Sequence, residues 1–313
     1  MNAEREITLI GATGNLGVPV VNYLAGFGFR IKVVARNVEK ARQLFKNLER
    51  ISIVYADLKN TESLKKALRN TKTLYLNLSS NTTDVHIDFA PEREGMANVL
   101  EAIDRESIRQ VLAISGLGAM ENIHENGRFE FIPNIIRKQG HKLLKQSGIP
   151  YTILHCSWFA DSFMLYRRKG IYTVLGDTQA PIYFTNGYDY SRQLVKAIGN
   201  GAAMFKEFPI QGKEGVGHLE AARRFLAIAA PETKVQPLPA FIIAVMALFN
   251  KELKLVKHMH TYFKRNTESY LGNSFQSFDI LGKPELSLED YAKKISHEGF
   301  YEALHAYKDD KKK

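Results

Sequence analysis

The fold of this chain is decided near its N-terminus by residues 7–17, whose sequence is ITLIGATGNLG. A mostly apolar run, Ile7-Thr8-Leu9-Ile10, precedes three glycines with the spacing G-x-x-G-x-x-G, and residues 18–25 continue with the apolar pattern of a helix. Free N–H groups at the start of a helix attract anions, and glycines let a ligand approach the backbone closely. The stretch therefore predicts a strand, a turn and a helix that together bind the phosphates of a nucleotide.

The alternation of strand and helix continues through the first half of the chain. Further strands are predicted at 31–35, 51–55, 73–76, 110–114 and 151–155. Three helices are predicted: one at 39–48, one that is capped by Thr61, and one across roughly 87–104. Strands that are apolar along their whole length and separated by helices form a parallel sheet covered on both faces. Right-handed crossovers then give an α/β, doubly wound Rossmann sheet.

After Gly148 the pattern has fewer strands and more turn residues. Helices are predicted near 189–199, 219–229 and 241–249, and a last one is expected to be capped by Ser287. We therefore expect an NAD(P)-binding Rossmann domain over residues 1–155. Residues 156–313 should form a smaller, mostly helical substrate-binding region, part of which returns to the Rossmann sheet. This region is expected to lie over the carboxyl ends of the strands, where ligands bind in such folds.

Composition excludes several classes of protein. One cysteine among 313 residues allows neither an internal disulfide nor a multi-cysteine metal site. The 43 Lys and Arg outnumber the 33 Asp and Glu, but no basic motif interleaved with aromatic residues accompanies this excess, so nucleic-acid binding is disfavoured. No apolar stretch reaches the ~20 residues of a membrane span, and no targeting segment is apparent. We expect a cytoplasmic monomer or homodimer.

The end of the second strand indicates which nucleotide binds. An NAD site usually has a carboxylate there, which accepts a hydrogen bond from the ribose 2′-hydroxyl. This chain has Arg36, with Lys40 one turn later, and a guanidinium binds phosphate in a fork. The alternative is a surface arginine at a helix start. We predict NADP(H), bound by Gly11, Thr13, Gly14, Asn15, Leu16, Gly17, Arg36, Lys40, Asp57, Leu58, Asn77, Leu78 and Ser79.

Together with the GIPYTIL sequence of residues 148–154, these motifs resemble the NmrA-like branch of the atypical short-chain dehydrogenases/reductases. That branch includes isoflavone-reductase-like enzymes, quinone reductases and NADP(H)-sensing regulators. The resemblance covers residues 6–165 well and continues weakly to residues 285–291. It implies a Rossmann fold, NADP(H) and a small-molecule substrate. A regulator of this kind would also bind a protein partner.

The Tyr-x-x-x-Lys pair of short-chain reductases has one literal match, Tyr55 to Lys59, on the adenine side of the sheet. We treat that match as chance. The resemblance instead implies a lysine eleven residues before Gly148, where this chain has Arg137. Arginine can stabilise an oxyanion but does not shuttle a proton.

The candidate catalytic residues are Ser115, Arg137, Lys138 and His141. Ser115 ends the fifth strand, and His141 lies four residues after Arg137, on the same helix face, as a candidate proton donor. The alternative is a solvated face formed by Arg137, Lys138, Lys142 and Lys145. The buried stripe of that helix would then be Ile135, Ile136, Leu143 and Leu144.

Three further features are weaker signals. His155 and Cys156 replace the Arg-Pro that the resemblance implies, and adjacent strand residues point to opposite faces, so we predict a buried, inert Cys156. His258 and His260 do not face each other on a helix, and no metal site is predicted. The apolar stretch 238–249 is interpreted as a core helix or cleft wall, with a membrane-surface helix as the alternative.

Two functions follow from these observations. The first is an NADPH-dependent oxidoreductase acting on a small apolar carbonyl, quinone or enone. The second is a catalytically weak NADP(H) sensor that regulates a protein partner, which is suggested by the arginine at the lysine position.

Overall fold

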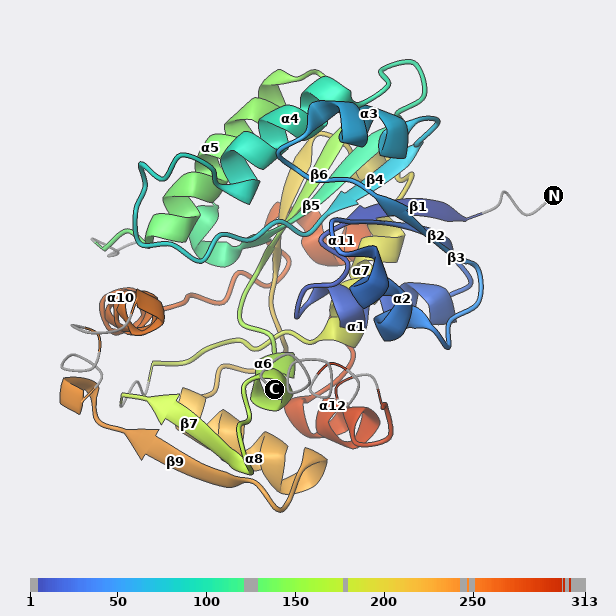
Figure 1. Ribbon diagram of the computed structural model, residues 1–313. Helices are drawn as coiled ribbons and strands as arrows, with labels where there is room; N and C mark the ends of the chain where they lie inside the picture. The colour runs from blue at the N-terminus through green and yellow to red at the C-terminus, as the bar shows by residue number, and fades with distance from the viewer. Residues whose placement is uncertain are drawn as a thin grey trace.

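A computed structural model describes residues 5–120, 129–176, 180–242, 247, 251–299, 301 and 304. Its main feature is a parallel seven-stranded sheet with the order β3-β2-β1-β4-β5-β6-β8 (Figure 1). Two further strands, β7 and β9, pair in parallel in a separate sheet. The order reverses between β1 and β4, which is the arrangement predicted for a doubly wound sheet.

All six predicted strands are present. They are β1 (Glu6–Ile10), β2 (Arg30–Ala35), β3 (Ile51–Tyr55), β4 (Thr73–Leu76), β5 (Gln110–Gly116) and β6 (Tyr151–Cys156). Sequence analysis missed β7 (Ile171–Leu175), β8 (Lys206–Ile210) and β9 (Lys234–Leu238). β8 has the sequence KEFPI, and its two charged residues and Pro209 obscure a strand pattern. β8 joins the main sheet next to β6, so part of the second region returns to this sheet. The domain boundary between residues 155 and 156 stays a prediction.

Helices cover both faces of the sheet (Figure 1). One face carries α3 (Thr61–Leu68), α4 (Met96–Ala102) and α5 (Ile132–Gln146). The other carries α1 (Gly17–Gly26), α2 (Val38–Phe45), α7 (Gly187–Ala197) and α11 (Ser277–Leu281). Each layer buries its own apolar cluster against the sheet, so the strands are apolar on both sides.

Two predicted helix starts are wrong. The predicted helix at 87–104 begins only at Pro91, with one π-helical turn (Pro91–Gly95) before α4. The chain before it is irregular because the Arg93 side chain binds the carbonyl oxygens of Val85 and Ile87. The cap of α3 is Asn60 rather than Thr61, since the Asn60 side chain accepts from the Ser63 N–H group at 2.9 Å.

A smaller unit follows the carboxyl ends of β6 and β8. It contains α6 (Asp161–Leu165), β7, α8 (His218–Ala229), β9 and α12 (Leu288–Ile295), and α10 (Lys251–Arg265) lies beside it (Figure 1). The predicted cap of α12 is confirmed, because Ser287 and Asp290 form a capping box. The predicted helix at 241–249 falls mostly outside the described residues. Among the described helices, none combines the length and apolar character needed to cross a membrane.

Candidate functional site

The glycine-rich loop between β1 and α1 is closed so tightly that side chains are excluded at two positions. Gly11 has φ +86°, and a Cβ there would lie 2.0 Å from the carbonyl oxygen of Asn77. A Cβ on Gly17 would lie 2.3 Å from the carbonyl oxygen of Gly11. No side chain caps the start of α1, and its first turn has no acidic residue. The helix therefore presents N–H groups and a positive dipole end, which fit a pyrophosphate.

The strand order places the other predicted cofactor residues at the same edge of the sheet. Arg36 directly follows β2, next to the loop after β1, and its side chain is exposed. No ion pair or hydrogen bond joins the Arg36 guanidinium to another residue of the described ranges. Lys40 lies in the first turn of α2, where its N–H group donates to the Asn37 cap at 2.8 Å.

The segments after β3 and β4 are fixed by neighbouring helices and strands. The Asp57 carboxylate accepts from the Lys59 N–H group at 2.9 Å, and the Leu58 carbonyl accepts from the Asn98 side chain at 2.7 Å. The Asn77 N–H group donates to Ile10 at 2.9 Å, which holds the two strand ends together. Leu78 is buried and Ser79 is exposed. These positions suit a dinucleotide lying across β3, β2, β1 and β4.

Arg137 is mostly buried instead of lying on a solvated helix face, and 19% of its side chain is exposed. Its Nε atom lies 3.5 Å from a carboxylate oxygen of Glu92, and its terminal nitrogen donates to Asn134 at 2.9 Å. Glu92 is itself buried and accepts a hydrogen bond from Ser80. Burial lowers the pKa of Arg137, while Glu92 acts in the opposite direction. The guanidinium lies near Gly116, where an added Cβ would come within 3.0 Å of its terminal nitrogen, and Gly116 follows the buried Ser115 at the end of β5.

The structure separates the four candidate catalytic residues. Arg137 and Ser115 lie near the end of β5, whereas Lys138 is exposed and lies 3.9 Å from Glu130. The prediction of a solvated helix face is therefore correct for Lys138 and wrong for Arg137. The predicted buried stripe also differs, because Leu143 is exposed and Gly140 takes an inner position. A Cβ at Gly140 would lie 1.7 Å from the Glu92 carbonyl oxygen, so glycine lets α5 approach that turn.

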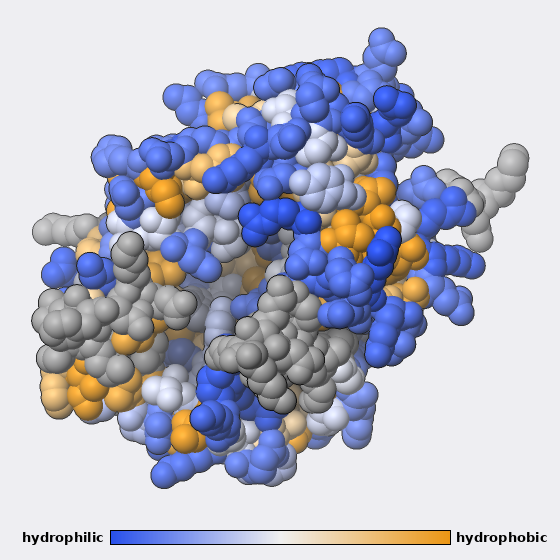
Figure 2. Space-filling view, in the orientation of Figure 1, coloured by the Kyte–Doolittle hydropathy of each residue, from blue (hydrophilic) through white to orange (hydrophobic). Residues whose placement is uncertain are grey.

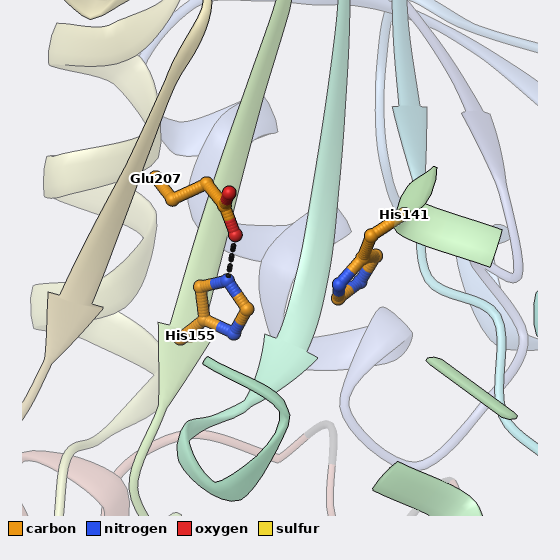
Figure 3. A group of neighbouring side chains, drawn as sticks. All are labelled: His141, His155 and Glu207. Atoms are coloured by element: carbon orange, nitrogen blue, oxygen red, sulfur yellow. Dashed lines mark hydrogen bonds and ion pairs between the residues drawn. The ribbon is translucent and has the colours of Figure 1, made fainter. Parts of the chain in front are cut away.

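His141 meets two residues that sequence analysis did not connect with it. Its ring lies edge-on to the ring of His155 on β6, with a centroid distance of 5.3 Å. Nε2 of His155 lies 2.7 Å from Oε2 of Glu207 on β8 (Figure 3). Burial and the neighbouring His155 lower the pKa of His141 to about 3, so its ring is neutral near pH 7. Burial raises the pKa of Glu207, but hydrogen bonds from His155 and Lys145 outweigh it and bring the pKa to about 2.

The prediction for His155 and Cys156 is confirmed. His155 faces α5, while Cys156 belongs to the apolar cluster on the other face of the sheet. Burial raises the pKa of the Cys156 thiol, which keeps it protonated. His258 and His260 make separate contacts: His258 accepts from the Ile132 N–H group at 3.0 Å, and His260 lies against Gly176.

A second polar group at the carboxyl end of the sheet was missed from sequence. Glu268, in the segment after α10, accepts hydrogen bonds from Ser157 at 2.8 Å and from Gln211 at 2.7 Å. Burial raises the pKa of Glu268. Tyr262 of α10 lies close to Gly118. Figure 2 shows that the surface is hollowed between the side formed by α5 and the side formed by β7 and β9. No motif in the sequence links Glu268 to β6 and β8, because the three segments meet only in the fold.

Comparison with known families matches residues 11–193 to a family described as NAD(P)H-binding. The chain belongs to the NAD(P)H-binding family. The matched residues include the glycine loop, Arg36 and all four candidate catalytic residues. The predicted family resemblance and the Rossmann fold are confirmed at this level.

Relatives of this NAD(P)H-binding protein are distant. An uncharacterized chloroplastic protein of Arabidopsis thaliana is 25% identical over 161 residues, which are 48% of this chain and 58% of the relative. The Photosystem II assembly factor Ycf39 of Trieres chinensis is 20% identical over 247 residues, or 77% and 75% of the two chains. The NADPH-dependent quinone oxidoreductase QOR2 of Escherichia coli, solved with NADPH, shares the fold with a TM-score of 0.67. It is 19% identical, with 92% of this chain and 99% of that chain covered.

Proposed function

We propose that this protein is an NADPH-dependent oxidoreductase that reduces a small apolar carbonyl, quinone or enone. Membership in the NAD(P)H-binding family supports the cofactor class. The choice of NADPH rests on one observation, the exposed Arg36 guanidinium at the end of β2, beside the glycine loop. A planar guanidinium suits the 2′-phosphate, and no carboxylate takes the place where NAD would need one. The fold shared with the NADPH-bound quinone oxidoreductase is consistent with this proposal.

The proposed chemistry depends on charge near the end of β5. When bound, NADPH supplies a hydride. Arg137, held by Glu92 and Asn134, provides a fixed positive charge beside Ser115, where a substrate oxygen would gain negative charge. The guanidinium keeps its proton, so the proton that completes the reduction comes from water. In this proposal Arg137 and Ser115 polarise the substrate. The neutral His141 and the exposed Lys138 are not assigned a catalytic role.

The cofactor proposal is tested by changing Arg36. We expect Arg36→Ala to weaken NADPH binding about tenfold or more and NADH binding very little, since a hydrogen bond to a charged group contributes roughly 1.5–3 kcal/mol. Fluorescence titration with both nucleotides measures the two constants. Arg30→Ala is the matched control, because Arg30 lies at the opposite end of β2 and pairs with Glu6. An equal loss for both nucleotides in Arg36→Ala would mean that the guanidinium does not contact the 2′-phosphate.

The reaction is tested with a panel of quinones and enones. We expect NADPH oxidation, followed at the nicotinamide absorbance, with at least one member of the panel. Arg137→Gln should lower kcat roughly a hundredfold, as for removal of an oxyanion-stabilising group, while NADPH affinity changes little. Lys138→Gln serves as control, since Lys138 is exposed on the same helix. Tight NADPH binding without turnover on any compound would rule out the enzyme proposal.

A second candidate function is an NADP(H) sensor that binds a protein partner. Two observations favour it: Arg137 is already paired with Glu92, and a relative is named a Photosystem II assembly factor. A sensor would retain a partner from extract with only one of the two nucleotides, NADPH or NADP+, when each is tested separately. Equal retention with the two nucleotides would remove this candidate.

A further inference from the structure

We propose that His141, His155 and Glu207 form a binding site for a divalent transition-metal ion, with Zn²⁺ as the ion their ligand types suit best. The three side chains come from α5, β6 and β8, which lie far apart in the sequence (Figure 3). None of them belongs to the glycine loop or to the Arg36 region. Two imidazole nitrogens and one carboxylate oxygen are typical ligands of zinc and are less suited to Mg²⁺ or Ca²⁺.

The geometry is close to what a tetrahedral ion requires. One ligand atom from each residue can be chosen so that all three lie within 4.8 Å of one another. Ligands about 2.0–2.1 Å from a zinc ion lie roughly 3.3 Å apart, so small side-chain rotations would complete the site. Three protein ligands leave a fourth position open for water or another small ligand.

The surroundings of His155 and Glu207 resemble the outer support of a metal site. Nδ1 of His155 lies 3.3 Å from the Gly116 carbonyl oxygen, to which it would donate when Nε2 binds the ion, and Nε2 faces Glu207. Lys145 pairs with Oε1 of Glu207, and Oε2 faces His155. In metal sites the ligating imidazole and carboxylate are held by such additional hydrogen bonds. Because a metal ligand must be unprotonated, ion binding at Nε2 and at the Glu207 carboxylate would depend on pH.

His141 offers the third ligand atom of the group. The side chain is 6% exposed, and within the described ranges no hydrogen bond joins its ring to another residue. A coordinated ion between the two histidine rings would satisfy His141. Glu207 would balance part of the charge that the ion adds near Lys145 and Arg137.

The proposal is tested by equilibrium dialysis of the full chain, first stripped with a chelator, against Zn²⁺. We expect one bound ion per chain. Glu207→Gln and His141→Gln should each lower the affinity at least about tenfold, a loss typical of changes in or next to a ligand set. His297→Gln, which changes an exposed histidine after α12, should bind like the unchanged protein. No bound Zn²⁺, or the same affinity in all variants, would overturn the proposal.

A measurement on the unchanged protein guards against variants that fail to fold. Co²⁺ in place of Zn²⁺ should give the strong visible absorption of a four-coordinate site. Anomalous diffraction from crystals soaked with Zn²⁺ should place the ion between the three side chains. A weak six-coordinate spectrum, or an ion located only elsewhere on the chain, would refute the site.

Discussion

At the scale of single residues, Gly11 combines two constraints. Its φ of +86° is rarely adopted by residues with a side chain, and the Asn77 carbonyl occupies the space that a Cβ would need. The same contact joins the segments after β1 and β4, on either side of the point where the strand order reverses. The residue therefore fixes the shape of the loop and the spacing of two strand ends.

We predict that Gly11→Ala removes measurable NADPH binding and lowers the free energy of unfolding by more than about 1 kcal/mol, because both strain and a clash oppose it. Gly26→Ala is the control: Gly26 has no positive φ, and nothing lies within 4 Å of a Cβ built there. Urea unfolding and nucleotide titration of both variants give the two quantities. Unchanged nucleotide binding in Gly11→Ala would show that the loop does not hold the cofactor.

The features that the sequence predicts correctly follow from local order. The turn between β1 and α1 and the opposed directions of His155 and Cys156 depend on neighbours along one strand or turn, whereas the cofactor role of Arg36 stays a prediction. Prediction was wrong where partners come from distant segments. Nothing local reveals that Glu92 would bury Arg137, or that Glu207 would meet His155. A charged residue on a helix is expected to be solvated until the fold supplies its partner.

At the scale of secondary structure, α8 begins with a histidine enclosed by aromatic rings. His218 lies about 6 Å from the rings of Phe163, Tyr172 and Phe184, and the Tyr172 hydroxyl lies 3.1 Å from its Nε2 atom. Burial lowers the pKa of His218 to about 4. The positive end of the helix dipole also disfavours a charged imidazole there.

This environment predicts how stability depends on pH. Below about pH 6.5 the unfolded chain binds a proton at His218 that the folded chain excludes until about pH 4. The free energy of unfolding should therefore fall with decreasing pH across this range, by up to about 1.4 kcal/mol per unit from this group. Urea unfolding from pH 7 to 4.5 should show a shallower fall in His218→Gln. The exposed His297 provides the control, and an identical slope in His218→Gln and His297→Gln would contradict the argument.

The elements that sequence analysis missed share a physical cause. β7 and β9 lie outside the main sheet, and the first two residues of β8, Lys206 and Glu207, are charged and not buried. A continuous apolar run signals a strand buried on both faces, and alternation signals a half-buried one; the KEFPI sequence of β8 shows neither pattern. The long helix predicted at 87–104 is shortened because the segment before Pro91 is held by Arg93, a contact between side chain and backbone that apolar spacing does not encode.

At the scale of the whole molecule, one carboxylate connects the smaller unit with the sheet's helical layer. Asp161 of α6 is fully buried and accepts from the Gly187 N–H group of α7 at 2.9 Å. It also accepts from the hydroxyl of Tyr291 on α12 at 2.8 Å and from that of Tyr301. Burial raises the pKa of Asp161, and these donors oppose the rise. Segments from three distant parts of the chain thus share one acceptor.

We predict that Asp161→Ala lowers the free energy of unfolding by on the order of 3 kcal/mol, because buried donors lose their acceptor. Asp279→Ala is the control, since Asp279 is an exposed residue of α11 whose carboxylate accepts a hydrogen bond from the Asn273 side chain. Urea unfolding measures both variants. A loss in Asp161→Ala no larger than in Asp279→Ala would mean that this connection contributes little to stability.

The end of the sheet at β8 bears on how this protein avoids unwanted association. Ile210 directs its carbonyl group toward β6, so the backbone of Pro209 faces the outer side of the strand, where proline offers no N–H group. The turn at Ser274–Gln276 and α11 also pack against β8. A strand from another chain that paired with β8 would find no N–H donor at Pro209, and the edge of β8 is already covered. This border is therefore expected to resist amyloid-like, edge-to-edge polymerisation even at high protein concentration.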